Sequence, residues 1–277
     1  MFSTLDGFIN LINSNSEKLD LHQESLISIN REGDSLERYI KDGFCNLLNK
    51  QLDEKESLEE YSKVFSWTGA QNHPPDLMIR GGDAIEVKKS ASLAPTSFQL
   101  NSSPPRQKMS SKDPMINQRI KDCENWTEKD VVYCLGSVTN QAINNIWFVY
   151  GDCFVASPDT YKSIKVDIKD FLKNMSYEMA ETNELGRINN YDPLGHSSLR
   201  IRGMWSLKHP RSIFGNFTNQ KNNGLYFVAR KEKFKSFGAN TINKLKKIDK
   251  IKSLDFKTED PDNPNKSIEC KILKYEI

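Results

Sequence analysis

The sequence predicts an α/β fold in which a central mixed β-sheet is flanked by α-helices. Strands predicted at 77–80 and 84–88 are separated by a predicted helix from strands at 131–138 and 145–156. Strands joined through a crossover helix are typical of α/β sheets with helices on both faces. The two later strands are apolar enough to be central in a sheet covered on both faces. No internal repeat or clear linker interrupts the sequence, so we expect one domain over residues 1–277.

The first 65 residues are predicted to be helical. Leu5, Phe8 and Ile9 recur at helical spacing, and a second apolar series runs over residues 36–47. Asp34 with Glu37 three positions later has the pattern of a capping box, which predicts the start of the second helix. The highly charged residues 49–63 are expected to form an exposed helix.

From residue 74 the pattern changes to short strands around Gly81 and Gly82, as in a hairpin. The next segment, 91–112, is rich in Ser, Pro and Asn, and we expect a long loop. Further elements are expected as follows: a helix at 114–126 with Pro114 in its first turn, a helix at 159–180, and a strand at 224–231.

Composition excludes several classes of protein. Hydrophobic residues make up 37% and charged residues 27%, as in a chain with a buried core and a polar surface. We expect no membrane span, because no run approaches 18 uncharged apolar residues, and no secretory signal. The five cysteines are scattered without a CxxC pair, so neither a disulfide scaffold nor a structural zinc site is expected. These features favour the cytoplasm.

The net charge of +2 hides an asymmetry along the chain. Residues 1–196 hold 21 Lys and Arg against 29 Asp and Glu, whereas residues 197–277 hold 18 against 8. A one-sided basic segment indicates a polyanionic partner such as nucleic acid. A solvated lysine-rich surface is the alternative that charge alone leaves open.

One short segment combines the groups needed for metal-assisted phosphodiester hydrolysis. Side chains alternate along a strand, so Glu86 and Lys88 project from one face and Val87 from the other. The predicted turn can bring Asp76 back beside Glu86, and two neighbouring carboxylates favour a cation between them. Mg²⁺ fits, with the Val87 carbonyl as a further ligand and Lys88 beside the metal to orient or deprotonate water.

The pattern is short, and an ordinary amphipathic strand after a Gly-Gly turn could also produce it. Asp83 is expected to be a turn residue, although it could replace Asp76 if the hairpin register differs. Lys89 should point away from Glu86 and Lys88.

Asp76, Glu86, Val87 and Lys88 together resemble the PD-(D/E)xK nuclease signature. The wider set of motifs resembles the NgoPII-type type II restriction endonucleases, in order over about residues 30–230: PPDLMIRGGDAIEVKK, LNSS (100–103), WFVYGDCF (147–154), DPLG (192–195) and RIRGMW (200–205). The resemblance implies a restriction-endonuclease-like fold with catalytic residues Asp76, Glu86 and Lys88. It also implies Mg²⁺-dependent cleavage of double-stranded DNA at a short G/C-rich palindrome such as GGCC. A homodimer and a functional pairing with a DNA methyltransferase are implied as well.

Glu37 is a further catalytic candidate, because in similar nucleases an acid on the helix before the catalytic hairpin can hold a metal-bound water. Two structural roles compete with this one. Glu37 could complete the capping box with Asp34, or it could pair with Lys41 one turn later.

Two segments offer donors for phosphates and base edges. The predicted DNA-binding residues are Gln99, Asn101, Ser102, Ser103, Arg106, Lys108, Arg200, Arg202, Lys208, His209 and Arg211. Arg200 and Arg202 should share one face, as side chains two apart on a strand do, and arginine reads guanine bidentately. A salt-bridged surface strand is the alternative. The predicted organisation is therefore a helical part (1–65), a catalytic core (74–156) and a basic DNA-binding part (190–277).

The leading hypothesis is a type II site-specific deoxyribonuclease. A repair or recombination nuclease of the same fold is one alternative, and a DNA-binding protein with a decayed active site is the other. The complete set of Asp76, Glu86 and Lys88 argues against decay.

Overall fold

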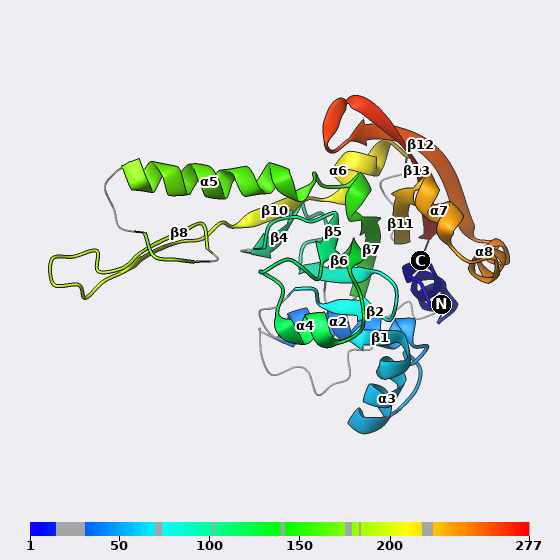
Figure 1. The fold of residues 1–277 in the computed structure, drawn as a ribbon. Helices are drawn as coiled ribbons and strands as arrows, with labels where there is room; N and C mark the ends of the chain where they lie inside the picture. The colour runs from blue at the N-terminus through cyan, green and yellow to red at the C-terminus, as the bar shows by residue number, and fades with distance from the viewer. Residues whose placement is uncertain are drawn as a thin grey trace.

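A large mixed β-sheet forms the centre of the computed structural model (Figure 1). The structure describes residues 1–14, 31–69, 74–101, 103–139, 142–174, 179–182, 184–217 and 224–276. Within these residues the sheet has nine strands, ordered β1-β2-β3-β6-β7-β11-β13-β12, with β5 paired to β6. The pairs β3–β6 and β7–β11 are parallel and the others antiparallel, which confirms the predicted mixed α/β fold.

The strands of this sheet are short at one edge and long at the other. Their bounds are β1 Phe65–Trp67, β2 Leu77–Ile79, β3 Ala84–Ser90, β5 Lys108–Ser110, β6 Glu128–Thr139, β7 Ala142–Tyr150, β11 Gly224–Arg230, β12 Ile251–Asp260 and β13 Asn263–Glu276. Two small ribbons accompany it, β4 (Ser97–Asn101) with β10 (Trp205–Lys208), and β8 (Gly186–Ile188) with β9 (Leu199–Ile201).

The helices are α1 Thr4–Asn13, α2 Arg31–Phe44, α3 Glu54–Val64, α4 Gln118–Asp122, α5 Pro158–Asn174, α6 Pro210–Phe214, α7 Lys231–Ser236 and α8 Ala239–Lys246. The predicted helical character of residues 1–65 is confirmed over the described part. The predicted cap is wrong, because α2 begins at Arg31 and Asp34 lies inside it. The helix expected at 114–126 is reduced to α4, which Asn117 caps.

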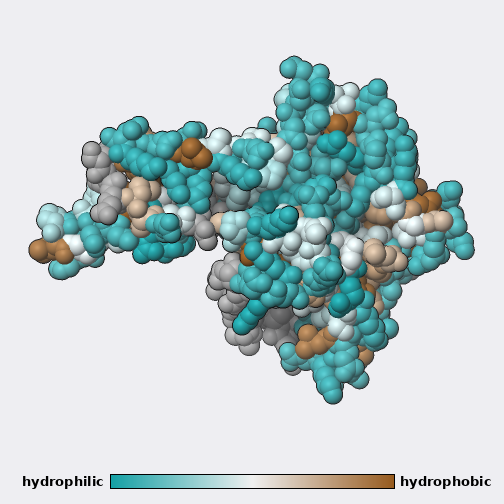
Figure 2. Space-filling model, viewed as in Figure 1, coloured by the Kyte–Doolittle hydropathy of each residue, from teal (hydrophilic) through white to brown (hydrophobic). Residues whose placement is uncertain are grey.

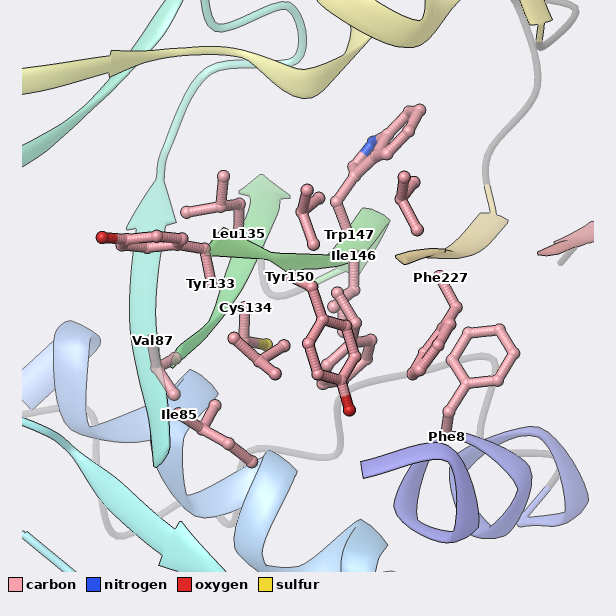
Figure 3. Close-up of a cluster of buried hydrophobic side chains, with 14 of the residues drawn as sticks. Phe8, Ile85, Val87, Tyr133, Cys134, Leu135, Ile146, Trp147, Tyr150 and Phe227 are labelled. Atoms are coloured by element: carbon pink, nitrogen blue, oxygen red, sulfur yellow. The ribbon is translucent and has the colours of Figure 1, made fainter. Parts of the chain in front are cut away.

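Helices α1 and α2 cover one face of the sheet through aromatic side chains. The ring of Phe8 lies 6.0 Å from that of Phe148 and 5.4 Å from that of Phe227. Phe44 of α2 lies 5.8 Å from Phe148. Figure 3 shows Phe8 of α1 reaching toward Phe227, on the side of the sheet to which Cys134 and Tyr150 also point.

The opposite face carries a ribbon and a short helix instead of long helices. Trp147 stacks on Tyr226 at 4.0 Å and meets His209, the N-cap of α6, edge-on at 6.1 Å. Phe98 of β4 lies 5.3 Å from the same histidine. The β4–β10 ribbon and α6 therefore cover the face that carries Trp147 and Leu135 (Figure 3).

The segment 91–112, expected to be a loop, contains both β4 and β5, so that prediction is wrong. Phe98 and Leu100 are buried while Gln99 and Asn101 are exposed, an alternation characteristic of a strand. Its high content of Ser, Pro and Asn obscured this short alternation.

An arm made of α5 and the β8–β9 ribbon extends away from the sheet (Figure 1). Leu172 of α5 is 6% exposed, and a Cβ on Gly186 would lie 2.9 Å from its Cδ1 atom. The predicted basic part, 190–277, is thus divided between this arm, the β10–α6 segment and the sheet strands β11 to β13. None of the described helices is long and apolar enough to cross a membrane.

Candidate active site

The β2–β3 hairpin places Asp76 next to Glu86. The strands pair with Leu77 opposite Ile85 and Met78 opposite Ala84. Asp76 therefore lies one step beyond the last paired residue, on the level of Glu86. The predicted strands and the turn at Gly81, whose φ is +66°, are confirmed.

A buried ion pair holds the backbone of this turn. The ammonium of Lys129 donates to the carbonyl oxygens of Ile79 at 3.1 Å and Gly82 at 2.7 Å, and it lies 2.5 Å from a Glu124 oxygen. Glu124 in turn accepts the N–H of Gly81 at 2.8 Å. These contacts hold the turn that connects β2 to β3 in a fixed position.

Alternation along β3 separates the core from the candidate active site. Ile85 is fully buried and Val87 is 8% exposed, and both point to the α2 side. Glu86 pairs in register with Tyr133 and Lys88 with Leu135, on the opposite face of the sheet. Figure 3 shows Tyr133 and Leu135 on that face, so the predicted two-sided arrangement of β3 is confirmed.

Three oxygen atoms converge on the ammonium of Lys88. Its Nζ atom lies 2.6 Å from Glu86 Oε1 and donates to Asp76 Oδ2 at 3.2 Å and to the Val87 carbonyl at 3.0 Å. Asp76 Oδ2 also accepts the backbone N–H of Val87 at 2.6 Å. The four residues predicted from the sequence therefore form one cluster.

The charges and the burial of the cluster shift the pKa values of Glu86 and Lys88. Burial, and then the negative charge of Asp76, raise the pKa of Glu86 to about 7. The nearby cations Lys88 and Arg106 oppose this shift. Burial disfavours the charged form of Lys88, but the carboxylates of Glu86 and Asp76 raise its pKa above the ordinary value. A carboxyl group with a pKa near neutrality, beside a charged amine, is typical of a functional site.

The oxygens around Lys88 match the chemistry that Mg²⁺ prefers. Among the described residues no group of three or more His, Cys, Asp or Glu side chains gathers at one point. A cation here would rely on the carboxylates of Asp76 and Glu86, the Val87 carbonyl and water or substrate oxygens. Mg²⁺ is commonly bound through one or two carboxylates with several waters retained. The donor set therefore fits this ion.

Glu37 lies beside the β2–β3 hairpin. A Cβ placed on Gly69 would be 3.0 Å from both Glu37 Oε1 and the Asp76 carbonyl oxygen. The side chain is paired with Lys41 at 3.2 Å, one of the two structural roles considered for it. The role in a capping box is excluded, because α2 begins three residues before Asp34.

Asp83 lies in the turn between β2 and β3, as expected, but its side chain is a buried anchor and not a replacement for Asp76. It is 5% exposed and accepts hydrogen bonds from Thr4 at 2.7 Å and from Tyr150 at 2.6 Å. The ammonium of Lys233 lies 2.9 Å away. These contacts join the hairpin to α1, β7 and α7, on the face opposite Glu86, so Asp83 cannot serve the same cation as Glu86.

The outer face of the β4–β10 ribbon presents several of the predicted DNA-binding residues. Gln99, Asn101 and Lys208 are exposed there, while Leu100 and Leu207 are buried beneath them. The ribbon covers the same sheet face as Glu86 and Lys88. Ser102 lies outside the described residues, and Ser103 is half-buried directly after the ribbon.

Arg106 and Lys108 are held by acidic partners. The Arg106 side chain is 12% exposed and pairs with Asp113 at 3.0 Å. The backbone N–H of Arg106 donates to the Tyr133 hydroxyl at 2.6 Å, and Tyr133 is the residue of β6 that pairs with Glu86 of β3. Lys108 pairs with Glu128 at 2.6 Å. Arg106 is thus close to the cluster of Asp76, Glu86 and Lys88, whereas Lys108 is paired with Glu128, the first residue of β6.

Arg200 of β9 and Arg202, directly after this strand, lie on the same side, as predicted, and both bind Glu184. Arg200 makes a two-pronged contact at 2.9 and 2.6 Å, and Arg202 donates to the same carboxylate. Hydrogen bonds from Arg200 lower the pKa of Glu184 to about 2. The structure thus contains the salt-bridged surface strand that was the alternative to DNA contact.

The structure does not favour a DNA contact by His209. Its side chain is 2% exposed, and its Nδ1 atom accepts the backbone N–H of Arg211 at 3.0 Å. Arg211 is half-buried beside it. The physical reason is the N-cap role, which turns the ring inward against Phe98 and Trp147.

Two residues that hold candidate site residues in place, Tyr133 and Glu184, were not predicted from the sequence. Tyr133 ties the Arg106 backbone to the sheet, and Glu184 orders the two arginines of β9. Tyr133 lies in an apolar run, and only the pairing of β3 with β6 reveals that it shares a face with Glu86. Glu184 lies 16 residues from Arg200, so local spacing gives no signal of their contact.

The buried His209 predicts a loss of stability in acid. Burial, followed by the charge of Arg211, lowers the pKa of His209 from 6.5 to about 4. As the pH falls from 6.5 to 4, the unfolded chain binds a proton here and the folded protein does not, so the unfolding free energy falls. His209→Asn keeps a cap acceptor without titrating and should remove up to about 3 kcal/mol of this loss. Urea unfolding at pH 7 and pH 4 measures the change in unfolding free energy for the wild type and the variant. An equal change in the two proteins would contradict the lowered pKa of His209.

Comparison with known proteins extends over almost the whole chain. The family model described as NgoPII restriction endonuclease matches residues 3–261. The type II restriction enzyme NgoPII of Neisseria gonorrhoeae is 37% identical over 281 residues, and the match covers 99% of each chain. No solved structure matches the chain.

The match includes the hairpin that carries Asp76, Glu86 and Lys88, together with the β4–β10 ribbon and the arm. From the family match and the identity to this relative, we conclude that the chain belongs to the NgoPII restriction endonuclease family and is a type II restriction enzyme.

Proposed function

We propose that this restriction enzyme uses Mg²⁺ to hydrolyse phosphodiester bonds of double-stranded DNA at a short G/C-rich palindrome resembling GGCC. The observation that carries the proposal is the convergence of Glu86, Asp76 and the Val87 carbonyl on one cation, the Lys88 ammonium. The curated relative of the same length, a type II restriction enzyme, supports the substrate class.

Asp76, Glu86 and the Val87 carbonyl would hold Mg²⁺, which when bound supplies Lewis-acid polarisation of the phosphate and activation of water. Lys88 would orient the attacking water, accept or release its proton, and balance the charge that develops on the phosphate oxygens. Glu37, beside the Asp76 backbone, would position a water at the edge of this group.

The outer face of the β4–β10 ribbon is the proposed DNA surface nearest to the active site. Gln99 and Asn101 offer amide groups for base edges, and Lys208 offers a charge for phosphate. Ser103 and Arg106 continue this surface toward Glu86. Arg200 and Arg202 would reach DNA only by giving up Glu184, and we rank them below the ribbon.

A palindromic site calls for two active sites related by two-fold symmetry. Each chain supplies one set of Asp76, Glu86 and Lys88, so we propose a homodimer as the form that cuts both strands. We further propose a cytoplasmic enzyme paired with a DNA methyltransferase that protects the same sequence.

Replacing the charged groups of β3 should stop cleavage while DNA binding is retained. Glu86→Gln and Lys88→Met should each slow plasmid cleavage by roughly 10²–10³-fold or more, because each loses a group that stabilises developing charge. Lys63→Ala, at an exposed ion pair on α3, is the control and should cleave normally. Wild-type rates in either β3 variant would overturn the assignment.

Asp76→Asn should weaken Mg²⁺ binding, because it removes one charged ligand from the site. Calorimetry with target DNA present measures the affinity directly. Asp83→Asn, three residues before Glu86 but on the opposite face, should reduce stability without changing Mg²⁺ affinity. An Mg²⁺ affinity that follows Asp83 and not Asp76 would contradict the proposed site.

The ribbon surface can be tested by the salt dependence of DNA binding. If Lys208 contacts phosphate, Lys208→Ala should lower affinity for all sequences and reduce the slope of log affinity against log salt by about one unit. Lys257→Ala, an exposed lysine of β12, serves as the matched control. The ribbon would lose its proposed role if the two variants had the same slope as the wild type.

A further inference from the structure

The arm carries an apolar stripe that the described structure leaves exposed. Ile164, Ile168 and Phe171 of α5 follow the i, i+4, i+7 spacing that places side chains on one helix face. Phe171 is 62% exposed and Ile164 is 40% exposed. The stripe lies beside the face of α5 from which Leu172 packs on β8 and Lys165 donates to the Thr182 carbonyl, ahead of the ribbon.

Exposed apolar side chains are concentrated on this arm. Of the twelve exposed large hydrophobic residues in the described chain, seven lie between residues 158 and 204. Besides Ile164 and Phe171 they are Val166, Tyr191, Leu194, Leu199 and Met204. Figure 2 shows hydrophobic side chains along the arm and at its far end, where the molecule is narrowest. Such clustering on a projecting element marks an interaction surface.

The charge of the arm favours a protein partner over DNA. Residues 158–204 contain seven Lys and Arg and seven Asp and Glu, a balance that does not attract a polyanion. The basic pair Arg200 and Arg202 is moreover neutralised in part by Glu184. Because the net charge of the arm is zero, two copies of it can approach each other without net electrostatic repulsion.

We propose that the arm is the dimerisation element of this enzyme, and that the stripe of α5 packs against the same stripe of a second copy. The inference rests on the proposed function, since a palindrome cut in both strands calls for two chains with one active site each. A two-fold contact is self-complementary, so an identical helix face is a suitable partner. Apolar residues spaced as in this stripe form the seam of packed helix pairs.

The arm is large enough for this role. α5 is about 25 Å long, and together with the β8–β9 ribbon the arm extends over residues 158–204, more than the about 20–30 residues that a standard interface takes from each side. The arm also continues directly into β10, which pairs with β4 on the site face of the sheet. A contact through the arm would therefore set the distance between the two active sites.

The test compares two faces of one helix in the full-length chain. Sedimentation equilibrium without DNA should show a dimer for the wild type. The double variant Ile164→Glu with Phe171→Glu should raise the dimer dissociation constant by at least about 100-fold, because charges would be buried at the centre of the contact. Val166→Glu is the matched control: Val166 is 56% exposed on the other side of α5, and its dimer should be unchanged. Circular dichroism monitors the helix, and Phe171→Gln replaces the double variant if α5 unfolds.

Cleavage kinetics separate this inference from the proposed function. The double variant should retain Mg²⁺-dependent cleavage, with nicked plasmid appearing first and a rate that rises more steeply with enzyme concentration. A double variant that dimerises like the wild type, or a wild type that is monomeric both free and on DNA, would overturn the inference. A double variant that stays dimeric but loses DNA affinity would assign the arm to DNA. Absence of Mg²⁺-dependent cleavage in the wild type would instead remove the proposed function.

Discussion

The two-residue period of β3 is the constraint on which both the fold and the active site depend. Ile85 and Val87 are buried against α2, and the same strand must therefore direct Glu86 and Lys88 to the opposite face. A shift of one residue would bury two charges and expose two core side chains. The buried Lys129 and the anchor Asp83 hold the turn that leads into this strand. Stability and catalytic geometry are thus specified by the same backbone register.

The charged side chains of Asp76, Glu86 and Lys88 lie together on that face, and their charges alter the ionisation of Glu86 and Lys88. Burial and the charge of Asp76 raise the pKa of Glu86 and so favour its neutral form. Lys88, which pairs with both carboxylates, opposes this shift. The ammonium occupies a position where three oxygens already converge, which is the arrangement a divalent cation exploits. Lys88 thus offsets part of the negative charge that the two carboxylates place on this face.

The geometry of the β2–β3 hairpin could be predicted because its pattern is local: a Gly-Gly turn, alternating side chains and the spacing of Asp76 from Glu86. The parallel pairing of β3 with β6, which brings Tyr133 to Glu86, depends on contacts far apart in the chain and left no local pattern. The surroundings of the residues proposed to bind DNA were not predicted, because residue type does not reveal burial or ion pairing. His209 caps a helix, and Arg200 meets a glutamate from an adjoining loop. The β4 strand was hidden by a composition typical of loops.

The most direct test of the account is the position of a bound metal ion. Crystals of the enzyme with target DNA, grown with Mn²⁺ in place of Mg²⁺, would locate the ion by anomalous scattering. The account predicts a peak in contact with the carboxylates of Asp76 and Glu86 and the carbonyl of Val87, with the Lys88 ammonium moved toward the phosphate. A peak held instead by Asp83, or an ion on DNA that touches neither Asp76 nor Glu86, would contradict it.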